Sequence, residues 1–149
     1  MYQIFLALHL LAAIFAIGPL AHAVTTAARG LRSADAGATA ASARTTRLYA
    51  IASLIVVVLG FALMSMKAPG SHQAAGQFGD LWIWLSLLLW LVAVALAMAV
   101  VVPTLDRATA TIGRGEPVQA LAGRVAASGG VIALLFVAIV FLMVFQPGS

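Results

Sequence analysis

The polar residues of this 149-residue chain that could do chemistry are few, and histidine and methionine are foremost among them. His9 lies in a long apolar stretch, where an imidazole is costly to bury and is therefore a candidate for function. Met64 and Met66 lie at the end of a second apolar stretch, and Met143 lies at the end of the last one. Thioether and imidazole groups suit Cu(I), or haem iron as axial ligands. The pattern predicts a candidate haem or copper site that combines His9 with the three methionines.

A structural role for the same residues is the alternative, and under it the chain needs no cofactor. The imidazole of His9 would then make one hydrogen bond between helices, for example to Ser53 or Ser86. The methionines would fill apolar space. His22 follows His9 by 13 residues, about 20 Å along a helix, so the two cannot bind one metal ion. We expect His22 at the level of the lipid headgroups and His72 in a solvated loop.

Charged residues are absent from the apolar stretches, which counts against several classes of function. The four carboxylates, Asp35, Asp80, Asp106 and Glu116, lie in connections or at the ends of the stretches. Ion-coupled transporters and proton pumps generally need a charged group inside the membrane. Acid–base catalysis within the membrane needs a positioned proton donor or acceptor. The chain has no cysteine, which excludes thiolate metal sites and cysteine nucleophiles. We therefore expect that the protein is not an enzyme.

The composition predicts that membrane-spanning helices position these residues. Apolar residues make up 64% of the chain and charged residues 8%, whereas a soluble domain has about 25% charged residues. Four stretches lack Asp, Glu, Lys and Arg, and each is long enough to cross a hydrocarbon core of about 30 Å as a helix. The sequence predicts an all-α bundle of four transmembrane helices in one domain, 1–149, with spans at about 3–26, 47–67, 81–103 and 124–146.

Arginine marks one side of the predicted bundle. Eight Lys and Arg oppose four Asp and Glu, which gives a net charge of +4. Seven of the eight cations fall in the connections at about 27–46 and 104–123 or directly after them, and Lys67 alone lies near the connection between spans two and three. The positive-inside rule places the two arginine-bearing connections in the cytoplasm and both termini outside. The residues that determine this orientation are Arg29, Arg32, Arg44, Arg47, Arg107, Arg114 and Arg124.

Basic residues beside apolar helices predict contact with lipid and not with nucleic acid. The cations flank the spans, where anionic headgroups are their nearest partners. The first connection is rich in Ala, Thr, Ser and Gly and fits a short helix on the membrane or a flexible connector. We therefore expect a protein of the bacterial cytoplasmic (inner) membrane that contacts anionic lipid headgroups.

The first two spans resemble the last two, which suggests a duplication. Pro19 and Pro103 lie near the ends of spans one and three, and Arg47 and Arg124 precede spans two and four. Spans two and four also each end in a methionine-containing stretch followed by a proline. A unit of two spans keeps its orientation when it is repeated, so the fold is compatible with two parallel-repeated helical hairpins.

Small residues and proline are the expected points of close packing and bending. Gly60 and Gly130 lie on small-residue faces of spans two and four, where membrane helices approach each other closely. Gly18 and Pro19 interrupt span one, and proline both removes a backbone hydrogen bond and clashes with the preceding turn. We expect a bend just before Pro19, and a smaller effect of Pro103 because span three is expected to end there.

The first span also resembles a known family. Leu8-His9-Leu10-Leu11-Ala12-Ala13-Ile14, followed by Ile17-Gly18-Pro19, is similar to the small four-helix predicted integral membrane proteins of unknown function, of actinobacterial type. A more distant similarity extends to the copper-resistance D-type membrane domains, which also start with a histidine-bearing helix. Those domains usually carry Trp-x-Gly after the histidine, where this chain has Phe15-Ala16-Ile17-Gly18. The resemblance implies four spans and gives no activity.

Three classes of function remain open. The first is a non-enzymatic protein that acts by association, as an accessory or scaffold subunit of a larger membrane complex or as a homo-oligomer. The second is a redox-linked membrane protein that binds haem or copper through His9 and the methionines. The third is a channel or carrier for small solutes, for which the spans supply only Ser53, Ser86, Ser128 and His9 as polar groups.

Overall fold

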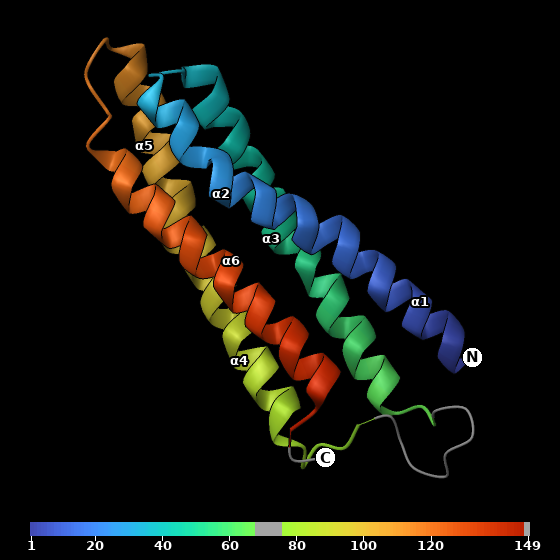
Figure 1. The fold of residues 1–149 in the computed structure, drawn as a ribbon. Coiled ribbons are helices and arrows are strands. Elements are labelled where there is room, and N and C mark those ends of the chain that lie inside the picture. The colour runs from blue at the N-terminus through green and yellow to red at the C-terminus, as the bar shows by residue number, and fades with distance from the viewer. Residues whose placement is uncertain (68–75, 148–149) are drawn as a thin grey trace.

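The computed structural model describes residues 1–67 and 76–147, and its long elements are helices that run alongside one another as a bundle (Figure 1). In chain order these are α1 (Tyr2–Ala12), the π-helical turn η1 (Ala13–Ile17), α2 (Gly18–Arg32), α3 (Ala36–Met64), α4 (Leu81–Leu96), the π-helical turn η2 (Ala97–Val101), α5 (Val102–Gly113) and α6 (Leu121–Phe145). Within the described residues, four continuous helical stretches are long and apolar enough to cross a membrane: Tyr2–Arg32, Ala36–Met64, Leu81–Gly113 and Leu121–Phe145. The predicted all-α, four-span membrane fold is confirmed.

The helices extend further than predicted on the side that carries the arginines, which we call the arginine end. The connection predicted at 27–46 is helical except at residues 33–35, and the one predicted at 104–123 is helical to Gly113 and again from Leu121. Asp35 explains the first difference, because its Oδ1 accepts a hydrogen bond of 2.9 Å from the backbone N–H of Ala38 and caps α3. The first connection is thus mostly the start of α3, and neither a separate surface helix nor a flexible connector.

The first and third stretches each contain a π-helical turn directly before a proline. η1 precedes Pro19 and η2 precedes Pro103, and in both stretches the helix continues past the proline. A π-helical turn is a local change in hydrogen-bond pattern that accommodates an interruption of the regular helix. The π-helical turn η1 lies where a bend was expected before Pro19, and the bend itself stays a prediction. The expectation that span three ends at Pro103 is wrong, because α5 runs on to Gly113. The two matching turns support the interpretation of two repeated hairpins.

The two hairpins pack together at the arginine end and separate toward the opposite end. In one hairpin α3 lies along α1, η1 and α2, and in the other α6 lies along α4 and η2. The hairpins join where α2 packs on α6 and α5 packs on α3. Figure 1 shows them diverging toward the end at which α1 begins and α6 finishes, which we call the terminal end.

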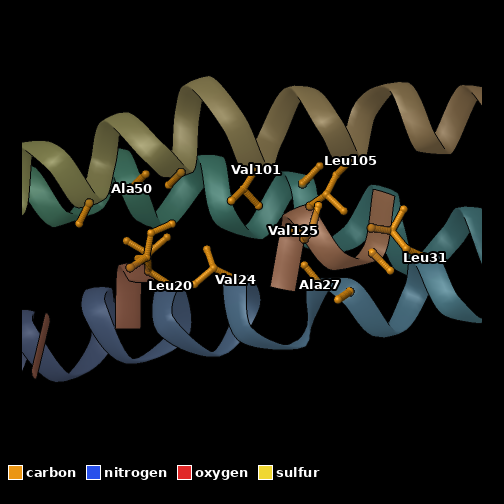
Figure 2. Close-up of a cluster of buried hydrophobic side chains, with 14 of the residues drawn as sticks. Leu20, Val24, Ala27, Leu31, Ala50, Val101, Leu105 and Val125 are labelled. Atoms are coloured by element: carbon orange, nitrogen blue, oxygen red, sulfur yellow. The ribbon is translucent and has the colours of Figure 1, made fainter. Parts of the chain in front are cut away.

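Branched aliphatic side chains and alanines fill the bundle where the hairpins meet. Figure 2 shows this core, whose fully buried side chains include Leu20, Val24, Ala27, Leu31, Val101, Leu105 and Val125. Among the described glycines, Gly129 lies nearest to the backbone of another helix, because an added Cβ would lie 2.2 Å from the carbonyl oxygen of Val24. The close contact expected through Gly130 therefore lies one residue earlier, because a Cβ on Gly130 meets nothing within 4 Å.

Polar contacts hold the arginine end together. The hydroxyls of Thr39 and Thr109 lie 2.8 Å apart and connect α3 to α5. Arg47 and Asp106 form an ion pair of 2.8 Å between the same helices, with both side chains about half exposed. Exposed pairs of this kind add at most about 1 kcal/mol, so the partly buried threonine contact matters as much as the ion pair for the register of α3 against α5.

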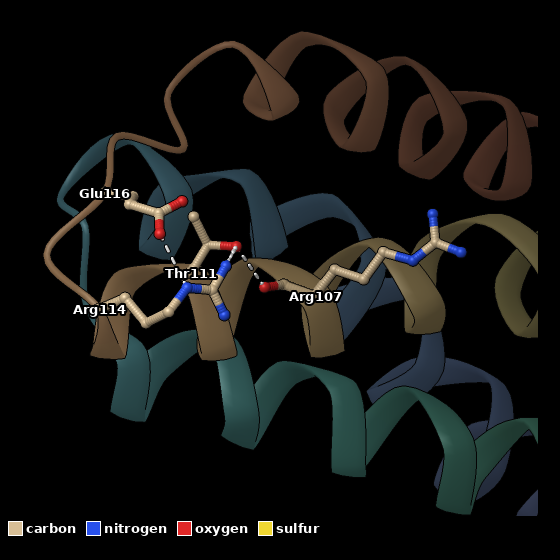
Figure 3. A network of polar contacts seen from close by, with 4 residues as sticks. All are labelled: Arg107, Thr111, Arg114 and Glu116. Carbon is tan, nitrogen blue, oxygen red and sulfur yellow. Dashed lines mark hydrogen bonds and ion pairs between the residues drawn. The ribbon is translucent and has the colours of Figure 1, made fainter.

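The turn after α5 has its own small network, drawn in Figure 3. Nε of Arg114 donates to Glu116 at 2.8 Å, and its NH2 group donates to the Thr111 hydroxyl at 3.3 Å. The Thr111 hydroxyl in turn donates to the backbone carbonyl of Arg107. The guanidinium of Arg114 lowers the pKa of Glu116, first through the hydrogen bond and then through its charge. The network ties the end of α5 to the connection that follows it.

Candidate functional site

A pocket of about 340 Å³ lies between the diverging hairpins, and we call it the terminal pocket. Its volume is at the lower end of the range of small-molecule sites. All four spans contribute to its wall. The lining residues that could take part in binding include His9 from α1, Gly60 and Met64 from α3, Trp82 and Ser86 from α4, Met143 from α6, and Gln146 directly after α6.

Helical spacing brings these side chains to the pocket. In α4 the lining residues Trp82, Ser86 and Trp90 recur every four positions and therefore share one face. In α1 the lining residues Tyr2, Leu6 and His9 are four and three positions apart, and they also share one face. The facing helices leave space between these two rows because the hairpins separate at the terminal end. The pocket is thus a consequence of how the hairpins are joined.

His9 is buried and held in one orientation. Its side chain belongs to a residue that is only 8% exposed, and its Nδ1 lies 3.0 Å from the carbonyl oxygen of Val56. A carbonyl only accepts, so Nδ1 carries the proton and, in the neutral ring, Nε2 keeps its lone pair. Gly60 leaves room for the ring, because a Cβ there would lie 3.3 Å from His9 Cε1. The expected serine partners of His9 are replaced by this backbone carbonyl.

Ser53 is engaged elsewhere. It accepts a hydrogen bond of 3.0 Å from Trp90 Nε1 and donates one of 2.7 Å to the carbonyl of Ala50. The hydroxyl is therefore satisfied, and it links α3 to α4 beside the terminal pocket. This arrangement fixes the position of the Trp90 indole, which forms part of the pocket wall.

Two polar groups at the terminal pocket have no hydrogen-bond partner within the described chain. These are the Ser86 hydroxyl, in a residue that is 5% exposed, and Nε1 of Trp82. Thr46 Oγ1, far from the pocket in sequence, is the third such atom among the described residues. An unpaired buried polar group costs about 1–3 kcal/mol, and native proteins generally pair such groups. Two of the three unpartnered atoms among the described residues therefore lie at one pocket.

The sequence identified Ser86 only as a partner of His9 or as part of a polar path, and it did not single out Trp82. The signal that could have found them together is their spacing of four residues at the start of α4, which puts both on one helix face. Their lack of partners could not be found in this way, because it depends on the angle between the hairpins.

The methionines of the predicted haem or copper site divide between two places. Met64 and Met143 line the terminal pocket with His9. Met66 instead lies in a separate, wide depression beside Met1 and Lys67. His72 lies outside the described residues. Among residues 1–67 and 76–147, no group of three or more His, Asp or Glu side chains is placed to hold a metal ion. The donors available to a metal in the terminal pocket are one imidazole and two thioethers.

Apart from the amide of Gln146, the remaining described residues that line the terminal pocket are apolar or aromatic, and none of the described lining residues is Asp, Glu, Lys or Arg. Exposed apolar side chains, including Leu10, Phe61 and Val144, form part of its rim. In a membrane-spanning helix such side chains face lipid. The pocket is therefore accessible to molecules dissolved in the bilayer.

Comparison with known proteins identifies a family. The family model described as "Predicted integral membrane protein (DUF2269)" matches residues 3–147, which is nearly the whole chain. Neither the curated proteins nor the solved structures contain a significant match. The family description agrees with the four spans of the fold and specifies no activity.

Proposed function

This chain belongs to the DUF2269 family of predicted integral membrane proteins, and from that premise we propose that it is a non-enzymatic protein that binds a lipid-soluble ligand in the terminal pocket. One observation carries the proposal: Ser86 Oγ and Trp82 Nε1 are buried at the pocket without a partner. An apolar pocket with a few polar groups is the usual form of a small-molecule site. A ligand that pairs these groups would remove the cost of leaving them unpaired.

The proposal includes an orientation in the bacterial cytoplasmic membrane. All seven arginines lie at the arginine end of the bundle, and the positive-inside rule assigns this end to the cytoplasm. The terminal pocket would then open in the outer leaflet, with both chain termini outside. Anionic headgroups of the inner leaflet would meet the arginine end. Labelling of cysteines introduced at Ser33 and Thr111 tests this, because reaction with an impermeant reagent in intact cells would contradict the orientation.

Retention of a ligand through purification tests the binding proposal. The protein is extracted from its native membrane in a mild detergent, and the bound small molecules are identified by mass spectrometry. We expect one species to be enriched over bulk lipid, and Ser86→Ala to reduce its recovery by at least tenfold. Ser128→Ala is the matched control, because Ser128 is a half-buried serine of α6 outside the pocket lining. Recovery of bulk lipid alone from wild type would contradict the proposal.

A haem or copper ligand is the second candidate, and the position of His9 favours it. Metal-binding histidines commonly donate one ring N–H to a carbonyl, which leaves the other nitrogen for the metal. His9 does this through Val56, and Met64 and Met143 line the same pocket. A Soret band or stoichiometric copper should then be lost in His9→Ala and kept in Met66→Leu. Colourless, copper-free protein from cells replete in haem and copper would contradict this candidate.

Action by association remains a proposal that is compatible with ligand binding. Gly18 and Gly130 have open space where a Cβ would lie, so their helices present small residues on outward faces. Such faces allow close approach of a helix from another subunit or a second copy. Cross-linking in native membranes, followed by a pull-down in mild detergent, should recover a defined complex. A uniformly monomeric, partner-free protein would contradict a role as an accessory or scaffold subunit.

A further inference from the structure

We infer that the ligand of the terminal pocket is a neutral lipid with a hydroxylated aromatic ring, of the hydroquinone class. The inference rests on the proposed function, namely that the pocket binds a lipid-soluble molecule. It adds the chemistry of that molecule, which follows from the hydrogen-bonding groups, the absence of charge, the depth of the polar groups and the shape of the wall.

The polar groups of the pocket suit a ligand that both donates and accepts hydrogen bonds. Nε2 of neutral His9 has a lone pair, and no hydrogen bond to it is found among the described residues, so it can accept one from a ligand. Nε1 of Trp82 is only a donor, so it needs an acceptor, and the Ser86 hydroxyl can serve in either role. A phenolic hydroxyl supplies both functions, whereas a quinone carbonyl or an ether oxygen only accepts.

The absence of charge in the wall argues for a neutral ligand. None of the described residues that line the pocket is Asp, Glu, Lys or Arg. A phosphate, carboxylate or ammonium group buried there would lose its hydration without gaining an opposite charge. Phospholipid headgroups and fatty acids are therefore poor matches for the polar groups, although their chains could cover the rim.

The polar groups of His9 and Ser86 lie deeper in the bundle than the first residues of their helices, whereas Trp82 is one residue from the start of α4. His9 is seven residues from Tyr2 at the start of α1, about 10 Å along the helix. Ser86 is five residues from Leu81 at the start of α4, about 8 Å along the helix. A ligand must bring its polar part into the apolar region to reach them. A ring that carries hydroxyls on a lipid tail is soluble at this depth.

Aromatic side chains favour a flat ligand. Tyr2, Phe61, Trp82 and Trp90 all line the pocket. Aromatic rings attract one another in offset-stacked and edge-to-face arrangements, which a saturated chain cannot reproduce. The Trp90 indole is fixed by Ser53, so this part of the wall is preformed for a ring.

Binding of matched probes to the full-length protein in lipid nanodiscs tests the inference. The probes are a short-chain alkyl hydroquinone kept reduced, its dimethyl ether, and a saturated alcohol of the same length. Binding is followed by quenching of tryptophan fluorescence and by calorimetry. We expect the hydroquinone to bind at least tenfold more tightly than either of the other two. In His9→Phe the hydroquinone and its dimethyl ether should bind equally, whereas His22→Phe, with an exposed histidine at the other end of the same stretch, should behave as wild type.

Ser86→Ala provides a second variant in case His9→Phe fails to fold, because it removes one oxygen without adding bulk. It should weaken hydroquinone binding by about tenfold. Equal binding of hydroquinone and dimethyl ether to wild type would overturn the role of the hydroxyl, and equal binding of the saturated alcohol would overturn the role of the ring. If none of the probes binds while another molecule co-purifies and depends on Ser86, the ligand class is wrong and the proposed function stands. If nothing binds and nothing co-purifies, both are overturned.

Discussion

Replacement of Gly129 by alanine should destabilise the protein more than other small changes in the spans. Gly129 of α6 faces the backbone of α2, and an added Cβ would lie 2.2 Å from the carbonyl oxygen of Val24 and 2.8 Å from its carbonyl carbon. Ordinary van der Waals contact begins at 3.4 Å, so the oxygen is about 1.2 Å too close. The neighbours are backbone atoms, which cannot move aside as the end of a side chain does. The helices α2 and α6 must therefore separate.

The size of the effect follows from what that separation disturbs. Overpacking a well-filled core costs about 1–3 kcal/mol, and more when the backbone must shift. Val24 and Val125, on either side of this contact, are fully buried, so the separation also loosens the core. The gain from replacing glycine by alanine in a helix is about 1 kcal/mol in the opposite direction. We expect a net decrease of about 2–3 kcal/mol in the free energy of unfolding.

Unfolding by sodium dodecyl sulfate in mixed micelles, followed by tryptophan fluorescence, measures this difference. Gly130→Ala is the matched control, because a Cβ at the next position meets nothing within 4 Å. That variant should be as stable as wild type or more stable. Equal stability of Gly129→Ala and Gly130→Ala would refute the assignment of Gly129 to a close contact between α6 and the backbone of α2.

Other substitutions at the arginine end should give smaller, graded effects in the same unfolding assay. Thr39→Val should lower the free energy of unfolding by about 1 kcal/mol because it loses the hydrogen bond to α5. Thr46→Val should be neutral or stabilising because the Thr46 hydroxyl is buried without a partner among the described residues. A larger loss of stability in Thr46→Val than in Thr39→Val would contradict this. Asp35→Ala should lower the free energy of unfolding by about 1 kcal/mol through loss of the α3 cap, whereas Asp35→Asn should retain most of the stability that the cap provides. Equal losses in the two variants would show that the cap is not the cause. Arg114 lowers the pKa of Glu116, so any stability from this pair is present above the unfolded pKa of the carboxyl and is lost as the pH falls through the folded pKa. Wild type should therefore lose a little stability at acid pH that Glu116→Gln does not lose. The same dependence of stability on pH in both proteins would contradict this.

The four spans could be predicted from the sequence because the bilayer imposes a strong rule. Stretches without charge and long enough to cross it must be helices. The arginine end was predicted less well, because residues 36–46 are mildly polar and look like a connection by hydropathy. They are helical because Asp35 caps them and because Thr39, Ala43 and Thr46 bury one face at helical spacing. That second signal is a pattern of small residues, which hydropathy alone does not register.

The site shows where sequence reasoning stops. His9 was identified from its residue type, but its partner is the backbone carbonyl of Val56, and no sequence pattern specifies a backbone acceptor. Gly129 and Gly130 are adjacent and identical in type, and only the rotation of α6 decides which one meets α2. Ser86 and Trp82 lack partners because the hairpins separate at the terminal end, and that angle depends on packing at the other end of the bundle.

The central claim is that a ligand completes the hydrogen bonds of the terminal pocket, and its effect on stability tests this most directly. A molecule that binds only the folded protein raises its stability by an amount that depends on its affinity. The measurement compares unfolding of delipidated wild type and Ser86→Ala, each with and without the small molecules that co-purify with wild type. The claim predicts that, without these molecules, Ser86→Ala is as stable as wild type. It also predicts that adding them stabilises wild type much more strongly than Ser86→Ala. Equal stabilisation of both proteins, or of neither, would contradict it.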